Sequence, residues 1–393
     1  MFEQPPAWMP EYLRKSDLLL SPPTDLSSPW PPAKIRDFLN DQQEQRWRET
    51  IGIPAEEIYA TIIVPIHNEQ KTLPSVLGAL MLSDIPDSAH LQFLFIVNGS
   101  TDDGASRTIV EQFLSDLGEV AEETIPVSSD SSLNAKTVSR NNLRFSLIGT
   151  DIASKTNALN IGNKIALDHG SVVTINLDAN NWVEPDAILN LLAKAYPAIL
   201  KDEALVFGSK YMIAYRPSAL SEFLKGAQKQ IGLLGTGYSS GLGGWLMAWN
   251  TLWLDRQGGF PAVTTDDYTL SLLTRRDGKE VMFAQNARVW GYFANNLKEK
   301  LSTYIRLVKD KLQVADYFQK DEQVLKLIEG DNTYMRPLYK RLNALIDQML
   351  HDPFKAGLFL LKFMAWEYAL FWGKREYQKN SQITTWEAID STR

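Results

Sequence analysis

The sequence predicts an α/β fold with a mixed, mainly parallel sheet flanked by helices. Three apolar runs rich in β-branched residues have the length of buried strands, and they cover 60–64, 91–97 and 171–177. Helical stretches are expected at 71–82, 102–117 and 154–168. Strands that alternate with helices form βαβ units, whose strands run parallel with helices on both faces.

The composition narrows the classes of chemistry. The 393 residues include 40 basic and 47 acidic side chains, for a formal net charge of −7, and no cysteine. An apolar content of 44% at this charge density indicates a folded chain. Without cysteine there is no disulfide, thiolate nucleophile or iron–sulfur cluster, so metal chemistry would depend mainly on carboxylates. The net acidity argues against a nucleic-acid partner, because duplex binding needs a basic surface.

The first 55 residues are expected to form an arm and not a domain. Eight of the 19 prolines fall within the first 32 residues, where they fix the backbone and remove hydrogen-bond donors. A short charged helix over about 33–50 is expected to lead into the first strand. The first residues show no basic stretch followed by an apolar run, which predicts a cytoplasmic protein without a secretory signal.

The remaining chain is divided by texture. We expect a ligand-binding half at 56–180, a second half at 181–296 with a strand at 205–210 and a helix from about Thr265, and a helical region at 297–393. The apolar helix at 354–372 is shorter than the roughly 20 residues that span a bilayer. It is apolar on most of its circumference, which leaves packing on the body and docking at the inner membrane face both open.

Unusual polar residues follow the predicted strands, where ligands bind in open parallel sheets. Pro65-Ile66-His67-Asn68-Glu69 follows the first strand, Asn98-Gly99-Ser100-Thr101-Asp102 follows the second, and Asp178-Ala179-Asn180 follows the third. Lys155 begins the helix that precedes Asp178. A carboxylate at a strand end that faces a lysine suits a diphosphate and a divalent cation.

These segments resemble, in order and spacing, the motifs of the GT-A glycosyltransferases of family 2. The family pattern runs Pro-x-(Tyr/Phe)-Asn-Glu, Asp-Asp-Gly-Ser-Thr-Asp, Gly-Lys-x-x-Ala-Leu-Asn-x-Gly, Asp-x-Asp, Gly-Gly-Phe and Thr-Glu-Asp-x-x-Leu. The corresponding segments here are 65–69, 97–102, 154–162, 178–180, 258–260 and 265–270. The resemblance extends over roughly 59–292 and implies a Rossmann-like GT-A fold.

The resemblance also implies roles for individual residues. Pro65 and Glu69 would shape the nucleotide pocket, Asn98 would lie near the base, and Lys155 would lie near the phosphates. Asp178, with Asn180, would bind the nucleotide sugar and a Mg²⁺ or Mn²⁺ ion. Asp267 would be the catalytic base, next to Asp266 in the place of the usual Glu. A carboxylate suits this role because a sugar hydroxyl is a weak nucleophile until its proton is removed.

Three departures from the family pattern qualify these roles. Asn180 replaces the second carboxylate of Asp-x-Asp, and a neutral amide is a weaker ligand for a hard cation. Val97-Asn98 replaces an Asp-Asp pair, which leaves UDP favoured and GDP open as the nucleotide. The Gln-x-x-Arg-Trp signature of processive synthases does not follow the base motif. Transfer of a single sugar is therefore expected, and not polymer extrusion.

The acceptor is expected to bind between the glycine-rich segment and the loop before Asp266. Gly243, Gly244 and Trp245 are the candidate contacts, with 235–238 nearby. Trp245, Trp249 and Trp253 could stack on a sugar, but buried aromatic side chains more often fill the core. The acceptor itself is left open between a lipid-linked sugar, a glycan, a small molecule and a peptide.

Three functions fit this sequence to different degrees. The first is an inverting hexosyltransferase that uses a nucleotide sugar. The second is a catalytically silent sugar-nucleotide-binding or scaffold protein on the same fold, suggested by Asn180 and Asn98. The third is a sugar-nucleotidyltransferase, which would usually carry a glycine-rich basic loop after the first strand, and 65–71 is not such a loop. Retention of Asp266-Asp267 favours the first, because a pure binding protein needs no base.

Overall fold

The structure is a computed structural model that describes residues 40–128, 131–214, 242–292, 297–331, 338–351 and 356–379. The proline-rich arm expected before residue 40 lies outside the described residues, and so does the candidate acceptor segment 235–238. The charged helix expected over 33–50 is described from Asn40 onward, as α3 (Asn40–Ile51).

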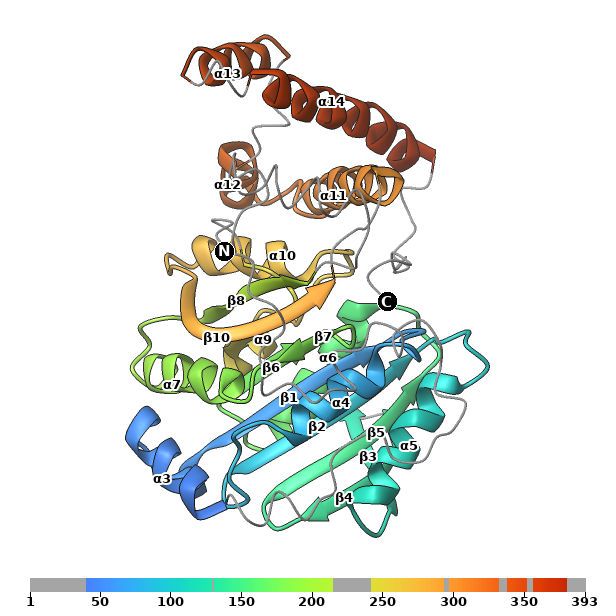
Figure 1. The fold of residues 1–393 in the computed structure, drawn as a ribbon, viewed down its shortest axis with the longest axis vertical. Helices are drawn as coiled ribbons and strands as arrows, with labels where there is room; N and C mark the ends of the chain where they lie inside the picture. The colour runs from blue at the N-terminus through green and yellow to red at the C-terminus, as the bar shows by residue number, and fades with distance from the viewer. Residues whose placement is uncertain are drawn as a thin grey trace.

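One ten-stranded sheet forms the body of the protein (Figure 1). Its strands lie in the order β3-β4-β5-β2-β1-β6-β9-β8-β10-β7. Their bounds along the chain are β1 (Tyr59–Ile66), β2 (His90–Asn98), β3 (Ala121–Ser128), β4 (Ser131–Arg140), β5 (Leu143–Thr150), β6 (Val173–Leu177), β7 (Asn181–Val183), β8 (Val206–Ala214), β9 (Leu246–Asn250) and β10 (Met282–Tyr292).

Parallel strands form the centre of this sheet. The neighbours β5, β2, β1 and β6 run parallel, as do β8 and β10. The other pairings are antiparallel, including the β3–β4 hairpin at one edge and β9 between β6 and β8. The predicted α/β class, with a mixed sheet flanked by helices, is confirmed. The boundary expected at residue 180 falls within this continuous sheet.

Helices cover both faces of the sheet because its central strands are apolar on both sides. On one face, Ile62, Val64 and Ile66 of β1 belong to a core with α3, α4 (Leu73–Met81), α5 (Ala105–Leu117) and α7 (Ala187–Leu200). On the other, Ile63 packs with α6 (Lys155–Asp168), α9 (Thr251–Arg256) and α10 (Asp266–Arg276). The helices expected at 71–82, 102–117 and 154–168 are therefore present.

Two helix starts position the polar residues of interest. α6 begins after Ser154, whose hydroxyl accepts a hydrogen bond from the N–H of Asn157 at 3.3 Å, a typical N-cap. α10 begins after Thr265 and carries Asp266 and Asp267 in its first turn, where the helix dipole favours negative charge. Lys155 and the two aspartates thus lie in the first turns of α6 and α10, near the carboxyl ends of the central strands.

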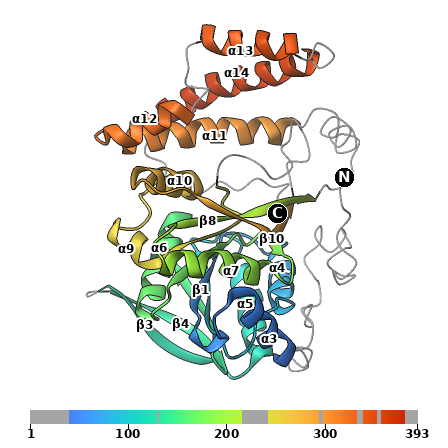
Figure 2. The same ribbon diagram turned by 90° about the vertical axis from the view of Figure 1, so that its left-hand side faces the viewer.

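A helical layer covers one end of the molecule's long axis (Figures 1 and 2). It contains α11 (Leu297–Tyr317), α12 (Glu322–Asp331), α13 (Leu338–His351) and α14 (Ala356–Lys379). The apolar helix expected at 354–372 is α14. It packs on α11, where the rings of Tyr304 and Trp366 stack at a centroid distance of 4.5 Å. Within the described residues, no helix has the length and apolar character needed to cross a membrane.

Candidate active site

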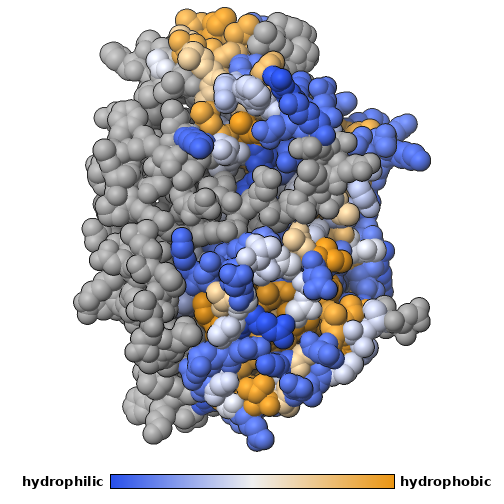
Figure 3. Space-filling view, turned by 90° about the vertical axis from the view of Figure 1, so that its right-hand side faces the viewer, coloured by the Kyte–Doolittle hydropathy of each residue, from blue (hydrophilic) through white to orange (hydrophobic). Residues whose placement is uncertain are grey.

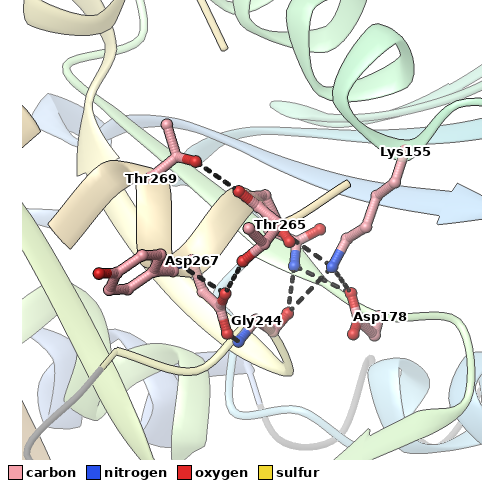
Figure 4. Close-up of polar contacts among 9 residues, drawn as sticks. Lys155, Asp178, Gly244, Thr265, Asp267 and Thr269 are labelled. Carbon is pink, nitrogen blue, oxygen red and sulfur yellow. Dashed lines mark hydrogen bonds and ion pairs between the residues drawn. The ribbon is translucent and has the colours of Figure 1, made fainter. Parts of the chain in front are cut away.

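A lysine and two aspartates meet beyond the carboxyl end of β6. Lys155 Nζ lies 2.5 Å from Oδ1 of Asp178 (Figure 4) and 2.9 Å from Oδ2 of Asp266. Their side chains come from the start of α6, the end of β6 and the start of α10, and little of any of them is exposed. The structure therefore brings together three of the residues that the sequence placed in one site.

The charges in this cluster shift one another's ionisation. Burial by itself lowers the pKa of Lys155, but the carboxylates of Asp178 and Asp266 outweigh it and hold that pKa above its ordinary value. Burial raises the pKa of Asp178 to about 6 despite the ammonium beside it. The cluster thus places the ammonium of Lys155 between two buried carboxyl groups.

Asp267 lies next to this cluster with its carboxylate held by three donors. Its Oδ2 accepts a hydrogen bond from the backbone N–H of Gly244 at 3.0 Å. Its Oδ1 accepts from the Thr265 hydroxyl at 2.9 Å and from the N–H of Tyr268 at 2.6 Å (Figure 4). Burial raises the pKa of Asp267, and the neighbouring carboxylate of Asp266 raises it further. The carboxylate is oriented, and its proton affinity is increased.

The segment of Gly243, Gly244 and Trp245 passes beside the cluster, where the Trp245 carbonyl oxygen accepts a hydrogen bond from the N–H of Asp178 at 3.0 Å. The carbonyl oxygen of Gly244 accepts hydrogen bonds from Asn176 Nδ2 at 2.5 Å and from Lys155 Nζ at 3.5 Å. A β-carbon on Gly244 would lie 3.2 Å from Lys155 Nζ, so the backbone approaches the ammonium closely. The three candidate acceptor residues thus border the charged cluster.

The other two candidate tryptophans are core residues. Trp249 is fully buried, and its ring meets that of Phe260 edge to face at a centroid distance of 5.3 Å. Trp253 is also buried, and its Nε1 donates to Asp277 at 2.8 Å. Their place in the core corrects the expectation that either could stack on a sugar, because the apolar interior between α6 and α9 takes both rings.

The predicted nucleotide contacts Pro65, Glu69 and Asn98 are buried at the neighbouring strand ends. The Thr72 hydroxyl lies 2.9 Å from Glu69 Oε2 and 3.1 Å from the carbonyl oxygen of Ala179, which ties the Glu69 turn to the turn that carries Asp178 and Asn180. Both side-chain amide atoms of Asn98 are buried without a hydrogen-bond partner among the described residues. Direct contact of these residues with a nucleotide stays a prediction.

A cavity of about 560 Å³ opens beside Val97, near the end of β2. It lies between the ends of β2 and β5, the start of α5 and the β3–β4 hairpin. Its lining includes Val97, Gly99, Arg107, Asn134, Thr150 and Asp151. A cavity of this volume is within the range of small-molecule sites.

Of the two predicted metal ligands, Asp178 and Asn180, only Asp178 offers a carboxylate to a divalent cation. Among the described residues, no three Asp, Glu or His side chains converge as a preformed metal site. Asp178 Oδ1 is already bonded to Lys155 and to Asn176 Nδ2, the latter at 3.1 Å, and Asn180 offers only an amide. Mg²⁺ is commonly held by one or two carboxylates together with substrate phosphates, so Asp178 fits such an ion only with a diphosphate bound.

Two residues of the site escape the sequence motifs. Asn176 lies two positions before Asp178 in β6, on the same face of the strand, and this alternation could have identified it. Tyr211 of β8 comes from a segment without a motif. Its hydroxyl oxygen is buried without a hydrogen-bond partner in the described part of the chain, and its ring lies 5.1 Å from that of Trp245. No signal in the sequence points to Tyr211.

A further residue outside the motifs, Asp310 of α11, contacts the loop before α10. Asp310 is buried and accepts a hydrogen bond from the Thr264 hydroxyl. Gln313 Oε1 accepts a second one from the N–H of Thr264 at 3.1 Å. The helical layer is therefore bonded directly to the loop that precedes Asp266 and Asp267.

No protein-family model and no curated protein matches this chain. Among solved structures, it is similar to the mannosyltransferase PcManGT from Pyrobaculum calidifontis in complex with GDP-Man and Mn²⁺, at 15% identity and a TM-score of 0.48, over 89% of this chain and 99% of that one. It is also similar to residues 1–349 of S. aureus TarS with UDP-GlcNAc, at 15% identity and a TM-score of 0.39, over 85% and 95% of the two chains.

Proposed function

We propose that this chain is an inverting glycosyltransferase of the GT-A type, in family 2, that moves one hexose from a nucleoside diphosphate sugar to an acceptor hydroxyl. The observation that carries the proposal is the convergence of Lys155, Asp178, Asp266 and Asp267 from three separate segments at the carboxyl end of the central strands. These are the positions at which the sequence resembles the family. Residues from distant segments are expected to converge in this way when they act together in one reaction.

The donor would bind across the half that ends at Asp178. The cavity beside Val97 has room for a nucleoside, with UDP favoured and GDP open. Lys155 would then face the diphosphate, whose negative charge grows as the sugar leaves, and an ammonium preorganised in a buried site stabilises that charge. A Mg²⁺ or Mn²⁺ ion held by Asp178 and the diphosphate, with Asn180 as a weaker neighbour, would supply further positive charge there.

Asp267 would act as the base. The acceptor oxygen forms a bond to the anomeric carbon while its proton passes to the Asp267 carboxylate. The bond from the anomeric carbon to the phosphate oxygen breaks, and its electron pair leaves with the nucleoside diphosphate. Direct attack inverts the anomeric configuration. The donors around Asp267 orient the carboxylate, and its raised pKa makes it a stronger base near neutral pH.

The acceptor would lie against Gly243, Gly244 and Trp245. The glycine backbone allows close approach, and the partly exposed Trp245 offers a ring face to a sugar. The Tyr211 hydroxyl is the nearby donor without a hydrogen-bond partner among the described residues. Tyr211 is therefore a candidate contact for the incoming hydroxyl or the donor phosphate.

The alternative is a silent sugar-nucleotide-binding protein on the same fold. It is favoured by Asn180, which weakens the cation site, and by Lys155, whose ammonium already pairs with both Asp178 and Asp266. The oriented carboxylate of Asp267 favours the enzyme, because a binding protein would have no use for a base held by three donors. The cytoplasmic location expected from the sequence stays a prediction.

Nucleotide release from a panel of UDP-, GDP- and dTDP-sugars tests the proposal. We would compare the wild type with Asp267→Asn and with the exposed control Asp202→Asn, each with Mn²⁺, with Mg²⁺ and with EDTA. Slow hydrolysis of one donor that is lost in Asp267→Asn and kept in Asp202→Asn is the expected result. Calorimetric binding of a donor with no turnover would favour the silent binder, and no binding of any donor would overturn both readings.

A further inference from the structure

The helices α13 and α14 carry an apolar face that the described residues leave uncovered. Seven large apolar side chains on α13 and α14 are between 38% and 75% exposed, and their spacing of three or four residues places them on one face of each helix. We call this set the outer apolar face. Its members are Leu342, Ile346 and Leu350 of α13 and Leu360, Met364, Tyr368 and Phe371 of α14.

The packing of these helices uses other side chains. On α14, Trp366 stacks on Tyr304 of α11, and Tyr377 donates a hydrogen bond to Asp316 of the same helix at 3.0 Å. A β-carbon on Gly373 would lie 2.8 Å from Val308, so the two helices meet closely there. On α13, Leu345 is buried. The outer apolar face is therefore not required for the attachment of α13 and α14.

The same two helices are basic within an acidic chain. Their sequences hold six Lys or Arg against three Asp or Glu, a net charge of +3, whereas the whole chain has −7. Lys374 and Arg375 are exposed, and the Arg375 guanidinium lies 5.2 Å from the ring centre of Trp372. Apolar and aromatic side chains combined with Lys and Arg are typical of helices that lie in the interface of an anionic membrane.

We infer that α13 and α14 form a docking surface for an anionic lipid bilayer, with the outer apolar face inserted among the headgroups and the basic residues attracted to the lipid charge. The shape of the molecule suits this contact, because α13 and α14 lie at the end of the long axis farthest from the β3–β5 edge of the sheet (Figures 1 and 2). Apolar residues gather on that end in the space-filling view (Figure 3).

A second copy of the chain is a weaker candidate for the same surface. Two copies that met through α13 and α14 would bring two positively charged surfaces together, and like charges in an interface oppose association. A bilayer of anionic lipids offers the opposite charge and an apolar interior at once. The charge of these helices therefore favours lipid.

Docking would also place the catalytic loop. α11 packs against α14 through Tyr304 and Val308 and holds Thr264 through Asp310 and Gln313. One helix thus connects the docking surface to the loop before Asp267. This consequence rests on the proposed function: a transferase held at a bilayer would meet an acceptor carried by a lipid.

Vesicle co-sedimentation tests the docking surface. We would use the full chain with vesicles of phosphatidylcholine alone and of phosphatidylcholine with phosphatidylglycerol, at low and high salt. The variants are Phe371→Glu and Leu350→Glu, and the matched control is Leu200→Glu on α7, since Leu200 is 60% and Phe371 61% exposed. Circular dichroism would verify the fold of each variant, and donor hydrolysis in the same samples would report on the active site.

We expect the wild type and Leu200→Glu to sediment with the anionic vesicles only, and less at high salt. Phe371→Glu and Leu350→Glu should bind at least about tenfold more weakly, because each loses the burial of a large apolar side chain. Equal binding of Phe371→Glu and Leu200→Glu, or no sedimentation of the wild type, would overturn the inference. A dimer of the wild type that dissociates in the Phe371→Glu variant would also overturn the inference. Donor hydrolysis should be unchanged in all variants, so failure here is distinguishable from failure of the proposed function.

Discussion

The Tyr211 hydroxyl lies directly beside Gly243, in the space that a β-carbon at position 243 would occupy. A β-carbon on Gly243 would lie 1.3 Å from the Tyr211 oxygen and 2.0 Å from its Cζ, distances that no pair of non-bonded atoms can adopt. The next residue, Gly244, donates its N–H to Asp267. A side chain at position 243 would therefore displace either the tyrosine or the backbone that orients the proposed base.

Gly243→Ala should lower both stability and donor hydrolysis. Overpacking of a filled site typically costs about 1–3 kcal/mol, and movement of Gly244 would release Asp267. Urea unfolding and nucleotide release would measure the two effects. Gly330→Ala is the control, because a β-carbon on Gly330 of α12 meets no atom within 4 Å and alanine favours helix. Equal stability and activity of the two variants would contradict the close contact.

Tyr211→Phe should separate stability from activity. The Tyr211 hydroxyl is buried without a hydrogen-bond partner among the described residues, so its loss should leave the unfolding free energy unchanged or higher. Burial, followed by the charge of Asp267, keeps the pKa of Tyr211 well above its ordinary value, so the hydroxyl remains a donor. We expect donor or acceptor KM to rise, or kcat to fall, by about tenfold.

Tyr196→Phe provides the opposite control. The Tyr196 hydroxyl donates to the carbonyl oxygen of Glu57 at 3.0 Å and accepts from the N–H of Tyr59 at the start of β1, whereas the site lies beyond the carboxyl ends of the strands. Removal of this hydroxyl should cost about 1 kcal/mol of stability and leave steady-state kinetics unchanged. If Tyr211→Phe behaved as Tyr196→Phe does, the hydroxyl of Tyr211 would have a structural role only.

Lys155→Met should destabilise the chain and weaken donor binding together. The substitution leaves the Asp178 and Asp266 carboxylates buried without their cation, and loss of one partner from a buried ion pair typically costs about 3–5 kcal/mol. Lys164→Met is the control, because its ammonium is exposed and 3.9 Å from Asp255. Urea unfolding and calorimetry with a donor would measure both effects. A small loss in Lys155→Met, equal to that of Lys164→Met, would count against a tight buried cluster.

The parts of this fold that the sequence predicts are those with continuous apolar patterns. β1, β2 and β6 are buried on both faces, so they appear as short runs of mostly apolar residues, and Ser154 marks the start of α6. The strands at and next to one edge of the sheet, β3 and β4, are harder to predict. β3 and β4 alternate exposed polar residues with few apolar ones, because one side of the hairpin faces water, and such segments resemble loops.

The residues of the candidate site also differ in how far the sequence predicts them. Local sequence patterns identify the residues that lie next to strand ends or helix starts. These residues are Lys155, Asp178, Asp266 and Asp267. Tyr211 and Asp310 enter through tertiary packing, since one lies within β8 and the other within α11. The residues next to them in the sequence form no pattern that indicates these tertiary contacts.

Asp310→Asn should raise stability at neutral pH. Burial raises the pKa of Asp310 to about 6 from the ordinary 3.8, so the folded state binds its proton more tightly than the unfolded state. Stability from this group is present below pH 3.8 and is lost as pH rises to about 6. Asparagine cannot ionise and can still accept from Thr264. Its advantage should grow from pH 4 to pH 7, to at most about 3 kcal/mol.

Urea unfolding of Asp310→Asn and the wild type at several pH values would measure that difference. Asp202→Asn, at an exposed position, should show no such trend. A constant difference between Asp310→Asn and the wild type across this range would mean that Asp310 titrates normally.

Asp266→Asn should move the acid limb of the pH–rate profile to lower pH. The proposed base, Asp267, can accept a proton only when ionised, and burial and then the Asp266 carboxylate raise its pKa above 3.8. The amide removes the like charge and frees Lys155, and both changes lower the pKa of Asp267. A weaker base should also lower the plateau of kcat/KM. The profile of kcat/KM against pH for the wild type, Asp266→Asn and Asp202→Asn measures this. A limb that stays in place in Asp266→Asn, or moves to higher pH, would show that a group other than Asp267 controls the rate.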